Sequence, residues 1–225
     1  MIEYTLVRSN RKTLAIHITG AATVEVRAPM KLAKAEIDRF VASKREWIEG
    51  HLELRGQRLA SRAAFALQYG DKLPLRGGEY PITARDGNRV GFDGERFYMP
   101  PDLPPEEIKR AAVQIYKMAA KGILTEKVIE RAKEMDVMPS AVKVNSARTR
   151  WGSCSGKRSL NFSWRLIMAD DEVVDYVVVH ELAHIREMNH SARFWEVVES
   201  VLPDWKRRRA RLRGLQTRLA EEDWD

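Results

Sequence analysis

The sequence predicts an α+β fold in which a β-rich N-terminal region, residues 1–100, precedes a largely helical region, residues 101–225. Stretches of alternating β-branched residues separated by glycines fill the first region, a pattern typical of strands and turns. Apolar stripes at helical spacing dominate the second region. A proline-rich run at residues 100–105 lies between the two patterns and interrupts regular structure. We therefore expect a domain boundary near residue 100.

Strands and one helical segment are expected in the first region. Residues 2–7, 14–19 and 23–27 show β-branched alternation. Residues 34–59 have their apolar side chains near helical spacing, which predicts a helix. Residues 67–99 contain short apolar stretches separated by glycine-containing turns, which is typical of a small meander or barrel-like unit.

The second region is expected to contain a long helix, a few strands and then three further helices. Residues 105–134 have an amphipathic stripe that indicates a packing helix. Residues 142–167 have the pattern of two or three strands around Gly152 and Gly156. A helix through residues 173–185 follows, then one from residue 191 to 201 and another after Pro203.

The most informative segment is His180-Glu181-Leu182-Ala183-His184. Acidic residues at 170–172 suit a helix N-terminus, and the following valines make the segment apolar on most sides, so we expect a buried helix. Histidines at positions i and i+4 then share one face with Cβ atoms about 5–6 Å apart, which suits two imidazoles on one zinc ion. Glu181 can deprotonate a metal-bound water. The segment predicts metal-assisted hydrolysis.

His190 is the expected third ligand. Its offset from His184 equals that in the H-E-x-x-H-x-x-G-x-x-H pattern of zinc proteases, although Glu187 replaces the glycine and Asn189 is expected to make the left-handed turn. A carboxylate on the next helix, Glu196 or Glu199, is the alternative ligand. Three protein ligands leave a fourth position for water, which is the catalytic arrangement of zinc.

Composition and charge limit the class of protein. The 44% hydrophobic and 32% charged residues are typical of a soluble chain, and no apolar run is long enough to span a bilayer. The single cysteine, Cys154, excludes an internal disulfide and fits a reducing cytosol, so we expect a cytoplasmic protein without a membrane partner. The net charge of +7 and an interval without acidic residues, 137–169, favour an anionic partner.

Further motifs resemble the YgjP-like family of predicted zinc-dependent metallohydrolases. The resemblance covers most of the chain and is carried by Arg148–Ser155, Asn161–Ile167, Tyr176–His184, Asn189–Ser191, Phe194-Trp195 and, near the N-terminus, Arg8–Lys12 and Trp47. It implies a zincin-like α+β metallopeptidase core with an added β-rich N-terminal region, in an intracellular setting. It also implies that His180, His184 and His190 are zinc ligands and that Glu181 is the general base.

The resemblance leaves two enzymatic activities open. The family core is similar to that of the SprT-like metallopeptidases, which favours a peptidase in which Arg148 or Tyr176 stabilises the oxyanion. A UTP pyrophosphatase activity is also associated with the family. In that case Arg148 and Arg150 would bind phosphate oxygens, and Trp151 would stack on the base unless it only packs against the metal helix.

A third hypothesis is a nucleic-acid-binding module with a non-catalytic metal. A basic run at residues 206–213 supports it, because lysine and arginine side chains bind phosphates. Glu181 and the open fourth coordination position oppose it, since a structural metal site needs neither. We therefore expect a cytoplasmic zinc hydrolase, with a peptide or an anionic substrate.

Overall fold

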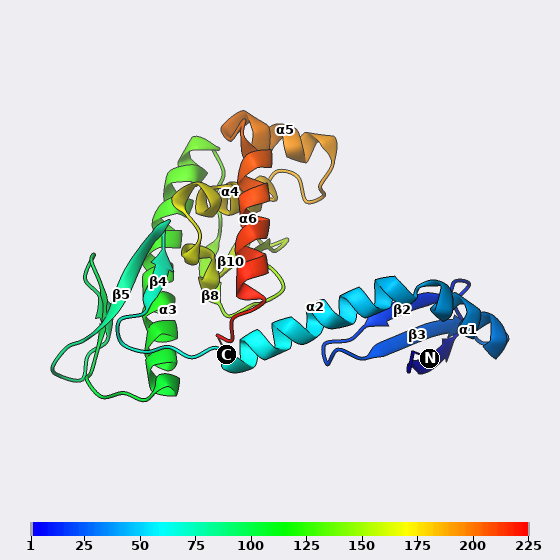
Figure 1. Cartoon of the computed structure of the whole chain (residues 1–225). Helices are drawn as coiled ribbons and strands as arrows, with labels where there is room; N and C mark the ends of the chain where they lie inside the picture. Colours follow the sequence, from blue (N-terminus) through cyan, green and yellow to red (C-terminus); the bar gives the residue numbers. More distant parts are fainter. Residues whose placement is uncertain (1, 225) are drawn as a thin grey trace. The chain divides into compact units, whose positions relative to one another are not determined.

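The computed structural model describes residues 2–224, which form six α-helices, one 3-10 helix and three small sheets (Figure 1). This mixture confirms the predicted α+β class. The chain divides into two compact units. The N-terminal unit comprises the residues up to Phe65 together with Ala220–Asp223, and the second unit comprises Ala66–Leu219 with Trp224. Among the described residues, every helix is too short or too polar to cross a lipid bilayer.

The N-terminal unit packs two helices on one face of a three-stranded sheet. Its elements are β1 (Thr5–Ser9), β2 (Ala15–Ile18), β3 (Val24–Pro29), α1 (Lys34–Ser43) and α2 (Arg45–Ala64). The central strand β3 pairs in parallel with β1 and antiparallel with β2. Its alternation buries Val24, Val26 and Ala28 against Ile37, Val41 and Ile48 of the helices. The single helical segment expected at residues 34–59 is two helices, because Lys44 leaves helical geometry at φ −109° and ψ 17°.

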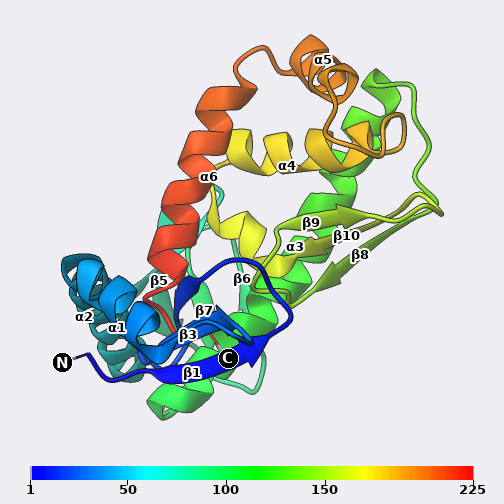
Figure 2. The same ribbon diagram turned by 90° about the vertical axis from the view of Figure 1, so that its right-hand side faces the viewer.

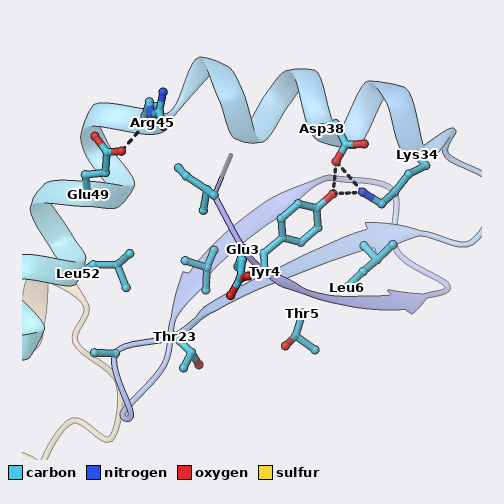
Figure 3. Close-up of a pocket in the computed structure, with 13 residues that line it drawn as sticks. Glu3, Tyr4, Thr5, Leu6, Thr23, Lys34, Asp38, Arg45, Glu49 and Leu52 are labelled. Carbon is cyan, nitrogen blue, oxygen red and sulfur yellow. Dashed lines mark hydrogen bonds and ion pairs between the residues drawn. The ribbon is translucent and has the colours of Figure 1, made fainter.

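A groove of about 1050 Å³, lined by both polar and apolar side chains, lies in the N-terminal unit (Figure 3). The Tyr4 hydroxyl donates a hydrogen bond of 2.6 Å to Asp38, and the Lys34 ammonium donates to both groups. A second ion pair joins Arg45 and Glu49 at 2.9 Å. Four charged side chains of the groove, Lys34, Asp38, Arg45 and Glu49, are thus paired within it.

The strands that follow belong to the second unit. β4 (Lys72–Leu75), β5 (Gly78–Ala84), β7 (Phe97–Met99) and β6 (Gly91–Phe92) form a four-stranded sheet in that order. Phe97 packs on Tyr116 of the long helix α3 (Pro105–Glu134), with ring centroids 5.3 Å apart. The chain therefore divides after Phe65, earlier than the boundary expected near residue 100, because this sheet packs on a helix beyond the prolines.

The remaining elements surround one buried helix, α4 (Asp171–Ala183), as the turned view in Figure 2 shows. The sheet β8 (Ala141–Asn145), β10 (Ser159–Ser163) and β9 (Gly152–Cys154) has that order, so the short strand β9 lies at one edge. The 3-10 helix η1 (Trp164–Met168) leads into α4, and α5 (Ala192–Val201) and α6 (Trp205–Leu219) follow it.

A buried carboxylate joins three of these helices. Asp175 of α4 is 4% exposed. It accepts hydrogen bonds from Arg131 of α3, one of them at 2.9 Å, and lies 3.5 Å from Arg208 of α6 and 3.6 Å from Lys127 of α3. A buried acid needs such partners, because an unpaired charge in the interior is strongly unfavourable. Asp175 therefore fixes α3 and α6 against the helix that contains the candidate site.

Candidate metal centre and active site

An N-terminal cap determines where α4 begins, and so which residues form its last turn. The Asp170 side chain accepts a hydrogen bond of 3.1 Å from the Val173 backbone N–H, which caps the helix as the acidic N-terminus predicts. Valine is a weak helix former, and α4 is held by burial of its apolar residues on nearly all sides. His180 lies in the last turn and His184 directly follows it, with ring centroids 5.1 Å apart. The two histidines therefore share one face, as their spacing predicts.

The chain then turns and brings a third histidine to this face. The Ser191 side chain accepts a hydrogen bond from the Phe194 N–H and caps α5, which places His190 just before that helix. The Nε2 atoms of His190 and His180 are 3.1 Å apart, and one ligand atom from each histidine lies within 4.8 Å of the others. Two nitrogens bound to one tetrahedral zinc would be about 3.3 Å apart. The spacing is suitable for a divalent metal.

One detail of this turn differs from expectation, and a second concerns the alternative third ligands, Glu196 and Glu199. Asn189 does not have the left-handed backbone that the missing glycine suggested, since it is not among the described residues with positive φ. Backbone hydrogen bonds from Arg186 and Glu187 to the Ala183 carbonyl make the turn instead. Among residues 2–224 the metal-suited cluster consists of the three histidines, without Glu196 or Glu199, both of which are exposed on α5.

The protonation of the histidines also fits a metal site. Burial, reinforced by the neighbouring histidines and Arg209, lowers the pKa of His180 to about 3, and burial lowers the pKa of His184. Neutral imidazole is the form that binds metals. His184 Nδ1 lies 3.1 Å from the Glu187 carbonyl oxygen, so this nitrogen donates and leaves the Nε2 lone pair available. The buried Nδ1 of His180 has no hydrogen-bond partner among the described residues.

Two aromatic side chains of α5, Phe194 and Trp195, pack against the histidine rings. The Phe194 ring lies 4.9, 4.5 and 4.8 Å from the rings of His180, His184 and His190. The Trp195 ring lies 5.8 Å from those of His180 and His190 and stacks on Trp205 at 4.2 Å. Packing of this kind restricts rotation of the imidazole rings.

Glu181 lies between α4 and the edge strand β9. Its side chain is nearly buried, and this burial raises its pKa to about 7 despite the opposing charge of Arg150. A Cβ atom built on Gly152 would lie 2.6 Å from both Cγ and Oε1 of Glu181. Glycine at position 152 therefore allows the strand to approach the carboxylate closely.

The other residues singled out from the sequence lie in two parts of the second unit. Arg148, Arg150 and Trp151 occupy the segment between β8 and β9, where both arginines are exposed and the charge of Arg150 acts on Glu181. Tyr176 is buried one turn before His180, with the two rings 5.9 Å apart. Burial raises the pKa of the Tyr176 hydroxyl, while the charge of Arg209 opposes this.

Sequence reasoning gave Phe194, Gly152 and Arg209 no individual role at the histidine cluster. The Ser-x-x-Phe spacing at the start of α5 predicts the cap but not the direction in which the phenyl ring points. The contact between Gly152 and Glu181 joins residues from different elements, which no local pattern reveals. Arg209 belongs to a run of basic residues, and the sequence alone does not show which of them pair with acids and which lie near the histidines.

The sequence matches a family of metallopeptidase domains. The model of the YgjP-like metallopeptidase domain matches residues 12–214. Among solved structures, the metallopeptidase zymogen abylysin of Pyrococcus abyssi is similar, at 20% sequence identity and a TM-score of 0.39. The match covers 44% of this chain and 98% of that chain. No curated protein gives a significant match to this sequence.

Proposed function

Because the chain belongs to the YgjP-like family of metallopeptidase domains, and is thus a metal-dependent hydrolase, we propose that it cleaves peptide bonds with zinc as its metal. His180, His184 and His190 are the proposed ligands. The observation that carries the proposal is the placement of these three histidines around one point, with the buried Glu181 carboxylate beside them. Three imidazoles with an adjacent carboxylate are the donor set of a catalytic zinc site.

Each residue of the site has a defined part in this proposal. A bound zinc ion supplies a Lewis acid that polarises a carbonyl and acidifies water. Glu181 accepts the proton of the attacking water and returns it to the leaving amine. A conjugate acid with a pKa of about 7 suits both steps at neutral pH. Phe194 and Trp195 hold the imidazole rings in place.

A peptide substrate is supported by the edge strand beside Glu181. β9 pairs with β10 on one side only, so its other edge offers backbone N–H and C=O groups to an extended chain. Tyr176 and Arg148 are the proposed donors to the developing oxyanion. Burial keeps the Tyr176 hydroxyl protonated by raising its pKa, which lets it donate a hydrogen bond.

A nucleoside triphosphate pyrophosphatase, with UTP as the expected substrate, is the second candidate. The observation that favours it is the positive charge of Arg150, which acts directly on Glu181. In this proposal Arg148 and Arg150 bind phosphate oxygens and Trp151 offers a stacking face. Glu181 has the same role as the base that activates water.

Replacement of Glu181 tests both candidates together. Glu181→Gln keeps the size of the side chain and all three histidines but cannot accept a proton. We expect zinc content to be unchanged and turnover to fall by roughly 10²–10⁴-fold. The measurement is cleavage of a degenerate peptide mixture and pyrophosphate release from UTP, with metal content determined by mass spectrometry.

The two substrates separate the two candidates. Peptide cleavage that is lost in the variant supports the peptidase, whereas pyrophosphate release that is lost in the variant supports the second candidate. Equal activity of the zinc-loaded wild type and variant on either substrate would remove Glu181 from that reaction.

A further inference from the structure

Helix α6 has two basic faces, and only one of them is paired with acids. Arg207, Arg208 and Arg211 form this paired face. Arg211 lies 2.8 Å from Asp170, and Arg207 and Arg208 lie 2.6 and 2.8 Å from Asp204. Glu172 of α4 accepts hydrogen bonds from all three through its side chain or its carbonyl. These arginines therefore fasten α6 to α4 and are largely neutralised.

The other face has two arginines one turn apart, Arg209 and Arg213. Both are exposed, and within residues 2–224 no carboxylate forms an ion pair with either. Like charges four residues apart on a helix repel each other, so this pair does not stabilise α6 itself. Pairing with an acid of the described chain therefore does not account for these two charges.

Aromatic contacts place Arg209 next to the histidine cluster. Its guanidinium carbon lies 5.5 Å from the centre of the Trp195 ring. That ring in turn lies 5.8 Å from the rings of His180 and His190. A single aromatic side chain thus separates the Arg209 charge from two of the proposed metal ligands.

Electrostatic effects agree with this position. Burial lowers the pKa of His180, and the charge of Arg209 lowers it further. At Tyr176, burial raises the pKa while the charges of Arg209 and then Arg213 lower it. The charges of both guanidinium groups therefore reach the face of α4 that holds the site.

We propose that Arg209 and Arg213 bind a negatively charged group of the substrate next to the bond that is cleaved, and so make the enzyme selective for acidic substrates. This inference rests on the proposed function, since it concerns the same site. A guanidinium binds carboxylate and phosphate oxygens in the same two-pronged geometry. The group is thus the carboxylate of an aspartate or glutamate in a peptide, or a phosphate of a nucleotide.

The test measures binding without turnover. The affinity of the zinc-loaded Glu181→Gln protein is measured for three probes. These are a fluorescent N-acetylated octapeptide of glutamate, the same octapeptide made of glutamine, and UTP. The variants are Arg209→Gln, Arg213→Gln and the control Arg207→Gln, each of which removes one positive charge from α6. At physiological salt, long-range attraction is screened and affects the three variants alike.

We expect Arg209→Gln and Arg213→Gln each to weaken binding of the glutamate octapeptide by about tenfold, because each removes a charge-assisted hydrogen-bond donor. Binding of the glutamine octapeptide should be unchanged. Arg207→Gln should change either affinity by less than about twofold, since its ion pairs are exposed. Weakened binding of UTP alone would also support the proposal and identify the bound group as a phosphate.

Equal losses in all three variants would overturn the proposal, because net charge alone would then explain binding. Equal affinity of the starting protein for the two octapeptides, together with UTP binding that no variant weakens, would also overturn it. The readout needs no cleavage. A protein that binds the acidic octapeptide through these arginines and cleaves no peptide would sustain this inference and contradict the peptidase assignment.

Discussion

Glycine at position 152 sets how close Glu181 can lie to the edge strand. The built Cβ at this position would overlap two atoms of the Glu181 side chain at 2.6 Å. Real Cβ atoms do not approach other atoms so closely, so a larger residue must displace the carboxylate or the strand. The position of the proposed base thus depends on a residue with no side chain of its own.

Gly152→Ala should therefore impair turnover while the three histidines keep their positions. We expect kcat/KM to fall by roughly 10²-fold with unchanged zinc content, since small displacements of a reacting group have effects of this size. Gly156→Ala is the matched control, because a Cβ there would meet nothing within 4 Å. Wild-type kinetics in Gly152→Ala would mean that Glu181 tolerates the displacement and does not need this approach.

At the scale of elements, α4 is held by a buried acid as well as by apolar packing. Asp175 contacts basic side chains of both α3 and α6, and its removal leaves Arg131 and Arg208 without their buried partner. Breaking a buried pair by removing one partner is far more costly than breaking a surface pair. Asp175 therefore contributes to the orientation of the helix that presents the histidines.

Asp175→Asn tests this contribution. The isosteric amide keeps the volume but removes the charge, and we expect the free energy of unfolding to fall by about 3–5 kcal/mol. Glu134→Gln removes the exposed partner of the same arginine and should cost less than about 1 kcal/mol. Urea unfolding monitored by tryptophan fluorescence measures both. Similar decreases in the free energy of unfolding for the two variants would show that the burial of Asp175 does not add to the stability of the protein.

The elements themselves were predictable where their signals are local. Residues 105–134 form one helix with the expected bounds, because the prolines before it and the apolar stripe within it are read along the sequence. The acidic start of α4 and the i, i+4 histidines are equally local. The break at Lys44 was missed because the apolar spacing continues across it, with Ile37, Val41 and Ile48 all packed in one core.

Long-range pairs were not predictable. The sequence shows a basic run at residues 206–213, but it does not show that Arg207, Arg208 and Arg211 meet acids more than thirty residues earlier. For the same reason, local composition does not predict that Phe97 packs on Tyr116. This contact assigns the four-stranded sheet to the second unit. Tertiary contacts of this kind depend on the whole fold.

At the scale of the whole molecule, the histidine cluster belongs to one unit only. The N-terminal unit has a core of its own, formed by β3, α1 and α2. A ligand stabilises the unit to which it binds, by an amount that grows with its concentration relative to Kd. Bound metal should thus raise the unfolding temperature of the second unit and leave that of the N-terminal unit unchanged.

Calorimetry with and without a chelator measures this difference. We expect two unfolding transitions, of which one moves to lower temperature when metal is removed and the other does not move. His190→Ala, which lacks a proposed ligand, should show a smaller shift than the wild type. A single transition that shifts as a whole would mean that the two units unfold together.

The one cysteine of these 225 residues lies on β9, beside the proposed base. Burial and the nearby Glu181 carboxylate raise the pKa of the Cys154 thiol, and a neutral thiol reacts slowly with alkylating reagents. When the Glu181 carboxylate is protonated or moves away from Cys154, its charge no longer raises the pKa of the thiol, and the thiol becomes more reactive. The rate of alkylation at a single atom thus reports the charge at the active site of the resting enzyme, without a substrate and without an introduced label.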